Sequence, residues 1–170
     1  MVLLQSEAMD AGIVFPDFTL RSPFGDHVTL SQAMGMRGIV VVFTCNHCPY
    51  AIKIWPDIIQ LSKEFDSSGI STIAINPNIH PDYPDDSPDK MIVNINQLGI
   101  PFPYLIDDTQ SIATAYGAVC TPDIYVLTPN RQLFYRGRID DLKCAIDSLV
   151  NDRELSFQPT PSIGCSIKWL

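Results

Sequence analysis

The sequence predicts an α/β protein with a central mixed β-sheet flanked by helices. The first observation is a continuous apolar, β-branched run at residues 39–43, which is typical of a strand buried on both faces. The second is an apolar helical stripe that follows this run and leads to another strand at residues 70–75. The third is a pair of apolar segments within residues 123–136, joined by a short turn. The first two predict parallel strands and the third predicts antiparallel strands, so the sheet is mixed.

The N-terminal forty residues predict a β-hairpin, with strands near residues 18–20 and 28–30 and a turn at Gly25-Asp26. The buried strand at residues 39–43 comes next, and a helix follows from about Pro49. This helix carries its apolar stripe at helical spacing and ends at Gly69; the stripe consists of Ile54, Ile58, Leu61 and Phe65.

The middle of the chain predicts an additional helix and a short strand. A long loop rich in Pro and Asp follows the second strand, and Ser87 then caps a helix that stops at Gly99. Residues 104–106 form a short strand, and Asp108 or Thr109 caps the next helix.

The C-terminal third predicts two antiparallel strands, residues 123–127 and 132–135, and a final helix that begins near Asp140 or Asp141. The tail from Glu154 carries little periodic signal. This order is similar to the layout of the thioredoxin fold, with an N-terminal β-hairpin extension and an inserted helix.

We expect one thioredoxin-like domain over residues 1–170, with its core at about residues 13–152 and a tail at residues 153–170. The net charge of −8 and the pI of about 4.6 argue against nucleic acid or an anionic membrane as partner. No apolar run approaches a membrane span, and acidic Glu7 and Asp10 argue against a targeting segment. The expected location is the cytoplasm.

Two of the five cysteines, Cys45 and Cys48, form a C-x-x-C pair where the buried strand ends and the helix begins. The helix dipole and the unpaired N–H groups of the first turn stabilise a thiolate there, and the thiolate is the form that attacks disulfides. We assign the role of nucleophile to Cys45, which we expect to be more exposed than Cys48. Cys48, which lies further inward, is the resolving thiol that breaks the mixed disulfide.

Three neighbouring features have two interpretations each. His47, between the two thiols, either favours the reduced state through its imidazole or faces solvent with no role. Thr121-Pro122, just before a strand, contains either a cis-proline or an ordinary trans-proline. The acidic loop at residues 82–86 either borders the site and selects basic partners or is a solvated loop.

Several stretches together resemble the thioredoxin superfamily, in particular its peroxiredoxin-like branch of redoxins, which are similar to alkyl hydroperoxide reductase and thiol-specific antioxidant proteins. They are residues 15–20, 43–50, 102–105, 116–123, 135–140 and 161–169. The resemblance implies that Pro122 is cis and packs beside the dithiol, and that Thr121 and Pro122 help to bind the substrate backbone. It also implies that Cys120 lies near the pair, either as an auxiliary thiol or as a small buried residue. The tail that contains Cys165 could fold back toward the site, although a structural role for Cys165 is favoured.

The resemblance also brings in peroxide reduction as an alternative activity. The peroxiredoxin frame is Pro-x-x-x-Thr-x-x-Cys, and Thr44 stands one residue too far from Cys48 to fit it. Cys45 intrudes into the frame, although Arg136 or Arg138 could still supply the charge that activates a peroxide. Disulfide exchange therefore ranks ahead of peroxide reduction.

Metal binding is the second alternative, since Cys45, His47, Cys48 and Cys120 could offer soft ligands to zinc or copper. The spacing contains no second C-x-x-C and no H-x-x-x-H, which places this alternative third. The prediction is thus a thiol-disulfide oxidoreductase without a cofactor. Its partners are protein or small-molecule disulfides and thiols, peroxides in the alternative case, and a reductase that donates electrons.

Overall fold

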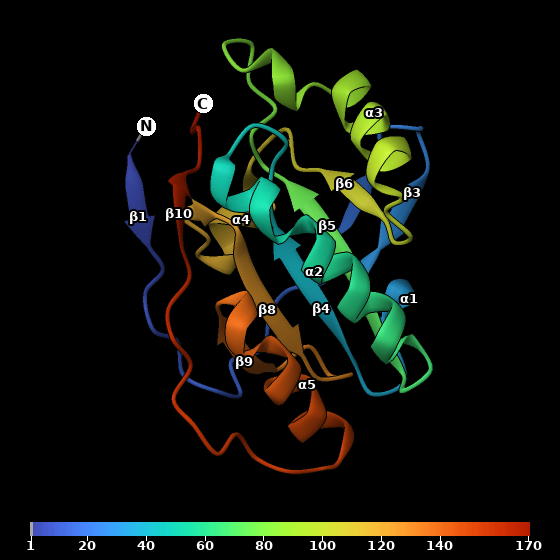
Figure 1. The fold of residues 1–170 in the computed structure, drawn as a ribbon, viewed down its shortest axis with the longest axis vertical. Coiled ribbons are helices and arrows are strands. Elements are labelled where there is room, and N and C mark those ends of the chain that lie inside the picture. The colour runs from blue at the N-terminus through green and yellow to red at the C-terminus, as the bar shows by residue number, and fades with distance from the viewer. Residues whose placement is uncertain (1) are drawn as a thin grey trace.

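The computed structural model describes residues 2–170 (Figure 1). The strands are β1 Leu3–Gln5, β2 Thr19–Arg21, β3 His27–Thr29, β4 Gly38–Phe43, β5 Ile70–Asn76, β6 Tyr104–Ile106, β7 Cys120–Thr121, β8 Asp123–Leu127, β9 Leu133–Gly137 and β10 Ile163–Ser166. The α-helices are α1 Leu30–Ala33, α2 Pro49–Asp66, α3 Pro88–Leu98, α4 Ser111–Tyr116 and α5 Leu142–Val150, and the 3-10 helices are η1 Pro84–Asp86 and η2 Ile139–Asp141.

Seven strands form the central mixed sheet in the order β3-β2-β6-β5-β4-β8-β9. β4 is parallel to β5 and antiparallel to β8, and β8 forms the predicted hairpin with β9. The predicted N-terminal hairpin of β2 and β3 is confirmed, and it joins the sheet because β2 pairs with β6. The mixed sheet and its order along the chain are therefore confirmed.

Helices cover both faces of the sheet. All six residues of β4 are buried, as a strand with helices on both sides requires. Side chains of α2 and α5 pack together on one face, and α1 and α4 pack on the other around aromatic rings that include Phe43, Tyr116 and Tyr125. The α2 stripe is confirmed as the inner face of that helix.

The prediction for the start of α4 was wrong. Its N-cap is Gln110 rather than Asp108 or Thr109. The carboxylate of the buried Asp107 accepts the N–H of Ala113 at 2.8 Å, so an acid before the expected position satisfies a backbone donor of this helix. The predicted cap at Ser87 is confirmed, because its hydroxyl accepts the N–H of Lys90.

A second, three-stranded sheet of order β1-β10-β7 was not predicted. It joins the two ends of the chain, which run side by side in Figure 1. β10 approaches β7 so closely that a Cβ atom on Gly164 would lie 2.0 Å from the Thr121 carbonyl oxygen. Only glycine permits this approach. None of the helices in residues 2–170 is both long and apolar enough to cross a membrane.

Candidate active site

The C-x-x-C segment occupies the loop between β4 and α2, as predicted. The N–H of Thr44 still pairs with the Ile75 carbonyl, which holds the end of β4 in the sheet. Cys48 is the N-cap of α2 and Pro49 is its first helical residue. Both Cys45 and Cys48 are 0% exposed, so the expectation that Cys45 is the more exposed was wrong. Solvent exposure therefore does not distinguish the roles of the two thiols.

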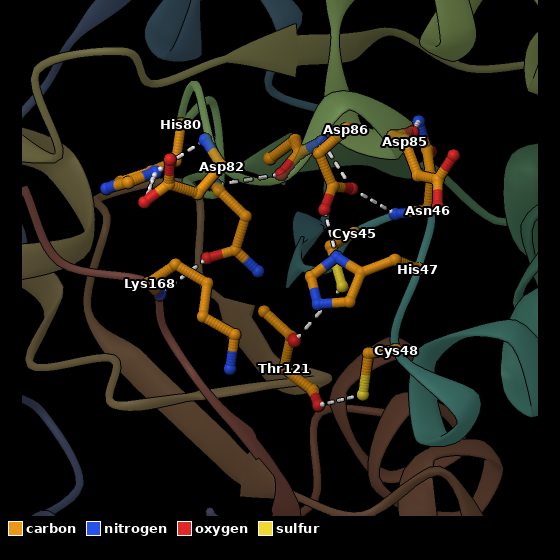
Figure 2. A network of polar contacts seen from close by, with 12 residues as sticks. Cys45, Asn46, His47, Cys48, His80, Asp82, Asp85, Asp86, Thr121 and Lys168 are labelled. Carbon is orange, nitrogen blue, oxygen red and sulfur yellow. Dashed lines mark hydrogen bonds and ion pairs between the residues drawn. The ribbon is translucent and has the colours of Figure 1, made fainter. Parts of the chain in front are cut away.

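Thr121 contacts both sulfur atoms (Figure 2). Its hydroxyl lies 3.3 Å from Cys45 Sγ, and its carbonyl oxygen lies 3.3 Å from Cys48 Sγ and accepts the Cys48 S–H. The peptide bond between Thr121 and Pro122 is cis, as predicted. The cis-proline loop thus lies directly against the dithiol.

Asp86 is a site residue that the sequence did not identify individually. It is fully buried at the end of η1, in the acidic loop, and its carboxylate accepts the Asn46 N–H at 2.6 Å and a hydrogen bond from His47 Nδ1. The amide of Asn76 also donates to it, at 3.3 Å. One signal was present in the sequence: the loop follows a strand parallel to β4, so it reaches the same edge of the sheet.

His47 is held between the acidic loop and the dithiol. The hydrogen bond from His47 to Asp86 is the largest cause that raises the pKa of His47. The ring stacks on Tyr83 with centroids 5.3 Å apart, and its Nε2 is buried without a hydrogen-bond partner among the described residues. The interpretation of His47 as a solvent-facing residue was therefore wrong, since its side chain is only 15% exposed, and a role for its imidazole stays a prediction.

Asn46 fixes the loop from the other side. Its Oδ1 accepts hydrogen bonds from Asn94 Nδ2 and the Tyr104 hydroxyl, each at 3.0 Å, and its Nδ2 donates to the Asp85 carbonyl at 2.9 Å. Because these partners come from three separate elements, the loop is held in one conformation.

The two thiols titrate as a pair. The hydrogen bond between them is the largest cause of both shifts: it lowers the pKa of Cys48 to about 4 and raises the pKa of Cys45. Burial and the nearby Asp86 carboxylate raise the pKa of Cys45 further. The Thr121 carbonyl favours the protonated form of Cys48, but an S–H donor is weak, and hydrogen bonds from Cys45, Cys165 and the Ala51 amide oppose it. The pKa of Cys48 is thus lowered and the pKa of Cys45 is raised.

A third thiol lies in the same buried cluster, and it is Cys165 of β10. Cys165 pairs directly with Thr121 across the β10-β7 ladder. Cys120 is buried outside this cluster, and burial raises its pKa to about 12. Because Cys120 immediately precedes Thr121 in β7, its side chain points to the opposite face of the strand from the Thr121 side chain.

The central part of the chain matches a known protein family. The AhpC/TSA family matches residues 11–136, which is more than half of the sequence. The chain belongs to the AhpC/TSA family. The sheet order and the cis-proline loop are those of a thioredoxin-like fold, as predicted.

Relatives of this AhpC/TSA protein include both redox activities considered from the sequence. A Mycobacterium tuberculosis protein named as a peroxiredoxin is 28% identical over 110 residues, which is 65% of this chain and 65% of that protein. The chain thus spans just under two thirds of that relative's length. The thiol-disulfide oxidoreductase ResA of Bacillus subtilis is 24% identical over 130 residues, 75% of this chain and 67% of that protein. The AhpC/TSA chain is therefore similar to proteins named for each of the two activities.

A solved structure resembles the chain over its whole length. It is an uncharacterized conserved protein from Geobacillus kaustophilus, with 35% identity, a TM-score of 0.96, and coverage of 100% of this chain and 97% of that chain. The match thus includes β1 and β10, which lie outside the segment that the family matches.

The two arginines considered for peroxide chemistry have other partners in this AhpC/TSA chain. Arg136 Nη2 lies 2.7 Å from the buried Asp123 carboxylate, and Arg138 Nε donates to the Pro161 carbonyl at 2.9 Å.

The candidate metal ligands also differ from the predicted set, since atoms of Cys45, His47 and Asp86 lie within 4.8 Å of one another. Because His47 and Asp86 are in direct contact, an ion placed between them would have to separate them.

Proposed function

We propose that this protein is a thiol-disulfide oxidoreductase in which Cys45 and Cys48 cycle between a dithiol and a disulfide. The observation that carries the proposal is the placement of two buried thiols at the start of α2, where the Thr121 hydroxyl and carbonyl oxygens each lie 3.3 Å from one of the two sulfur atoms. The pKa of Cys48 is lowered, chiefly by the hydrogen bond from Cys45, and the thiolate is the attacking species.

In the proposed mechanism Cys48 attacks first. Its thiolate attacks one sulfur of a substrate disulfide, forms a mixed disulfide and releases a thiolate. The negative charge on Cys48 is then gone, so the pKa of Cys45 falls and its thiol can lose a proton. Cys45 attacks the Cys48 sulfur, the second substrate thiolate leaves, and the Cys45–Cys48 disulfide forms. These roles reverse the sequence-based assignment, whose reason was the exposure of Cys45.

His47 and Asp86 set the charge around the pair. An imidazolium beside the thiolate stabilises it, and Asp86 keeps His47 protonated to a higher pH by raising its pKa. The Asp86 carboxylate also disfavours a thiolate on Cys45. Both effects support charge on Cys48. Thr121 serves as the positioning residue that contacts both sulfurs.

The test is reduction of insulin disulfides by dithiothreitol in the presence of the protein. Cys48→Ser is expected to abolish the acceleration and Cys45→Ser to lower it, whereas Cys144→Ser, on an exposed cysteine of α5, keeps it. Full turnover by Cys48→Ser would refute the mechanism. The Cys45–Cys48 reduction potential then gives the direction, since about −270 mV is typical of a reductase and about −120 mV of an oxidant.

Peroxide reduction is the second candidate, supported by the low pKa of Cys48 and by the relative named as a peroxiredoxin. Its distinguishing result is consumption of hydrogen peroxide that survives Cys45→Ser and is lost in Cys48→Ser. The ion pair between Arg136 and Asp123 argues against peroxide reduction.

Metal binding is the third candidate. Metal analysis of protein purified without chelator tests the Cys45, His47 and Asp86 group, and bound metal that His47→Ala removes would support this candidate.

A further inference from the structure

The C-terminal strand β10 brings a cysteine to the dithiol. β10 pairs antiparallel with β7, so that Cys165 is opposite Thr121 and Ser166 is opposite Cys120. Residues directly opposite each other in such a ladder carry their side chains on the same face of the sheet. Thr121 contacts both sulfurs of the C-x-x-C pair, so Cys165 shares the face that looks toward them.

The contact between Cys165 and Cys48 is direct. Cys165 is 0% exposed and packs with Cys45, Cys48 and Ala51 in one buried cluster. A hydrogen bond between the Cys48 and Cys165 thiols helps to lower the pKa of Cys48. The same buried cluster thus contains two thiols, Cys45 and Cys165, that can act as the resolving thiol for Cys48.

The surrounding charges allow Cys165 to share this role with Cys45. Burial and the hydrogen bond to Cys48 raise the pKa of Cys165 to about 12, but the ammonium group of Lys168 lowers it. The Asp86 carboxylate acts on Cys45 in the opposite direction and raises its pKa. Once Cys48 carries a mixed disulfide, its charge no longer opposes ionisation of either thiol, while the Asp86 carboxylate still raises the pKa of Cys45.

The end of the chain is held in place on both sides. β10 also pairs with β1, and the N–H of Lys168 donates to Asn78 Oδ1 at 2.9 Å. Lys168 Nζ lies 5.6 Å from the centroid of the Tyr83 ring, which itself stacks on His47. β10 is therefore held in place beside the active site by contacts along both of its edges.

We propose that Cys165 is a third redox thiol of this site and forms a disulfide with Cys48. The proposal rests on the proposed function, in which Cys48 is the attacking thiolate. The Cys48 thiolate attacks a disulfide RS–SR′, forms Cys48–S–S–R and releases R′S⁻. Cys165 loses its proton to water, and the Cys165 thiolate attacks the Cys48 sulfur. RS⁻ leaves, so the substrate disulfide is reduced by two electrons and Cys48 and Cys165 are oxidised to a disulfide.

β10 also occupies the place where the resemblance predicted substrate binding. The ladder edge of Cys120 and Thr121 that would hold a substrate backbone is already paired with this chain's own strand. A peptide that pairs with this edge must first displace β10, whereas a small disulfide need only reach Cys48.

The test uses 5,5′-dithiobis(2-nitrobenzoate), a small aromatic disulfide that releases a coloured thiolate at each exchange step. The background is Cys45→Ser with Cys144→Ser, which removes the other resolving thiol and the exposed thiol. We expect two coloured thiolates per protein, no retained aromatic group, and a peptide with Cys48 linked to Cys165. Adding Cys165→Ser halves the release and leaves the aromatic group on Cys48. Adding Cys120→Ser instead, the matched buried cysteine of β7, changes neither result.

The outcomes separate the two claims. An aromatic group that stays on Cys48 while Cys165 is present, or a Cys48–Cys120 link, overturns this inference and leaves the proposed function intact. No reaction at Cys48 in any of these proteins overturns both. The linked peptide is sought in protein with native Cys165, so the result does not depend on the folding of the Cys165→Ser variant.

Discussion

Replacing Asp86 with Asn tests how the acidic loop controls the site. The substitution keeps the size of the side chain and an oxygen that can accept the Asn46 N–H, but it removes the charge that His47 Nδ1 contacts. A hydrogen bond to a charged group contributes about 1.5–3 kcal/mol to stability. Because Asp86 is fully buried and the His47 side chain is only 15% exposed, solvent screening weakens this contribution little.

The loss of stability should depend on pH with a definite sign. The hydrogen bond to Asp86 raises the pKa of His47 in the folded protein. The stabilisation is therefore fully present below the unfolded value of about 6.5 and is lost as pH rises through the folded pKa. Asp86→Asn should lower the free energy of unfolding by about 1.5–3 kcal/mol near pH 5.5, and the loss should shrink toward zero near pH 9.

Urea denaturation at the two pH values measures this effect, and an NMR titration of the His47 ring measures the accompanying fall in its pKa. Asp85→Asn is the matched control, because it removes the same charge from the exposed neighbouring residue. A variant that is destabilised equally at both pH values, or an Asp85→Asn protein with the same pH dependence, would refute the role assigned to the contact between His47 and Asp86.

Three further predictions concern the neighbours of the thiolate and the core beneath it. Cys45→Ala removes the thiol that donates to Cys48, so the pKa of Cys48 should rise from about 4, as measured by thiolate absorbance at 240 nm; an unchanged titration would contradict the shared proton. Thr121→Val removes the hydroxyl that lowers the pKa of Cys45, so alkylation of Cys45 should require higher pH, and an unaltered rate profile would contradict that contact. Arg136→Met leaves Asp123 as an unpaired buried charge, so the free energy of unfolding in urea should fall by about 3–5 kcal/mol, and a much smaller loss would mean that Asp123 is neutral in the fold.

The elements that the sequence predicts well are those whose signal is local. The β4 strand is a continuous apolar run and α2 carries a helical stripe, and both depend on residues close together in the chain. The cap at Ser87 is likewise set by its own hydroxyl and the N–H three residues later. In each case the interaction that forms the element is contained in the segment that predicts it.

The elements that were missed depend on pairing between distant segments. β1 and β10 contain only three and four residues, and their register joins Leu3 to Cys165. Strands this short show no alternation of apolar and polar residues that could be distinguished from a loop. The sequence did not single out Asp86 for a related reason. One acid of an acidic loop becomes the buried hydrogen-bond partner of His47 only when η1 packs against the C-x-x-C loop.

The sequence contains only part of what distinguishes Cys120 from Cys165. Thr121 contacts the dithiol, and the period of two in a strand places the side chain of the preceding Cys120 on the opposite face. No local pattern favours Cys165, because the approach of β10 depends on Gly164 fitting against the Thr121 carbonyl.

The proposed assignment of the thiolate to Cys48 is supported by the position at which α2 begins. A proline is favoured at the first position of a helix, where its missing N–H has no partner to lose, and Pro49 takes that position. Cys48 is thereby fixed as the N-cap, next to the unpaired N–H groups and the positive end of the helix dipole, whereas Cys45 lies before the helix. Asp86 adds a negative charge on the Cys45 side, so both the helix and the acidic loop favour negative charge on Cys48. Pro49→Ala should let the first turn of α2 start earlier and so weaken the preference for negative charge on Cys48. The pKa of Cys48, measured from the pH dependence of its alkylation, should then be higher.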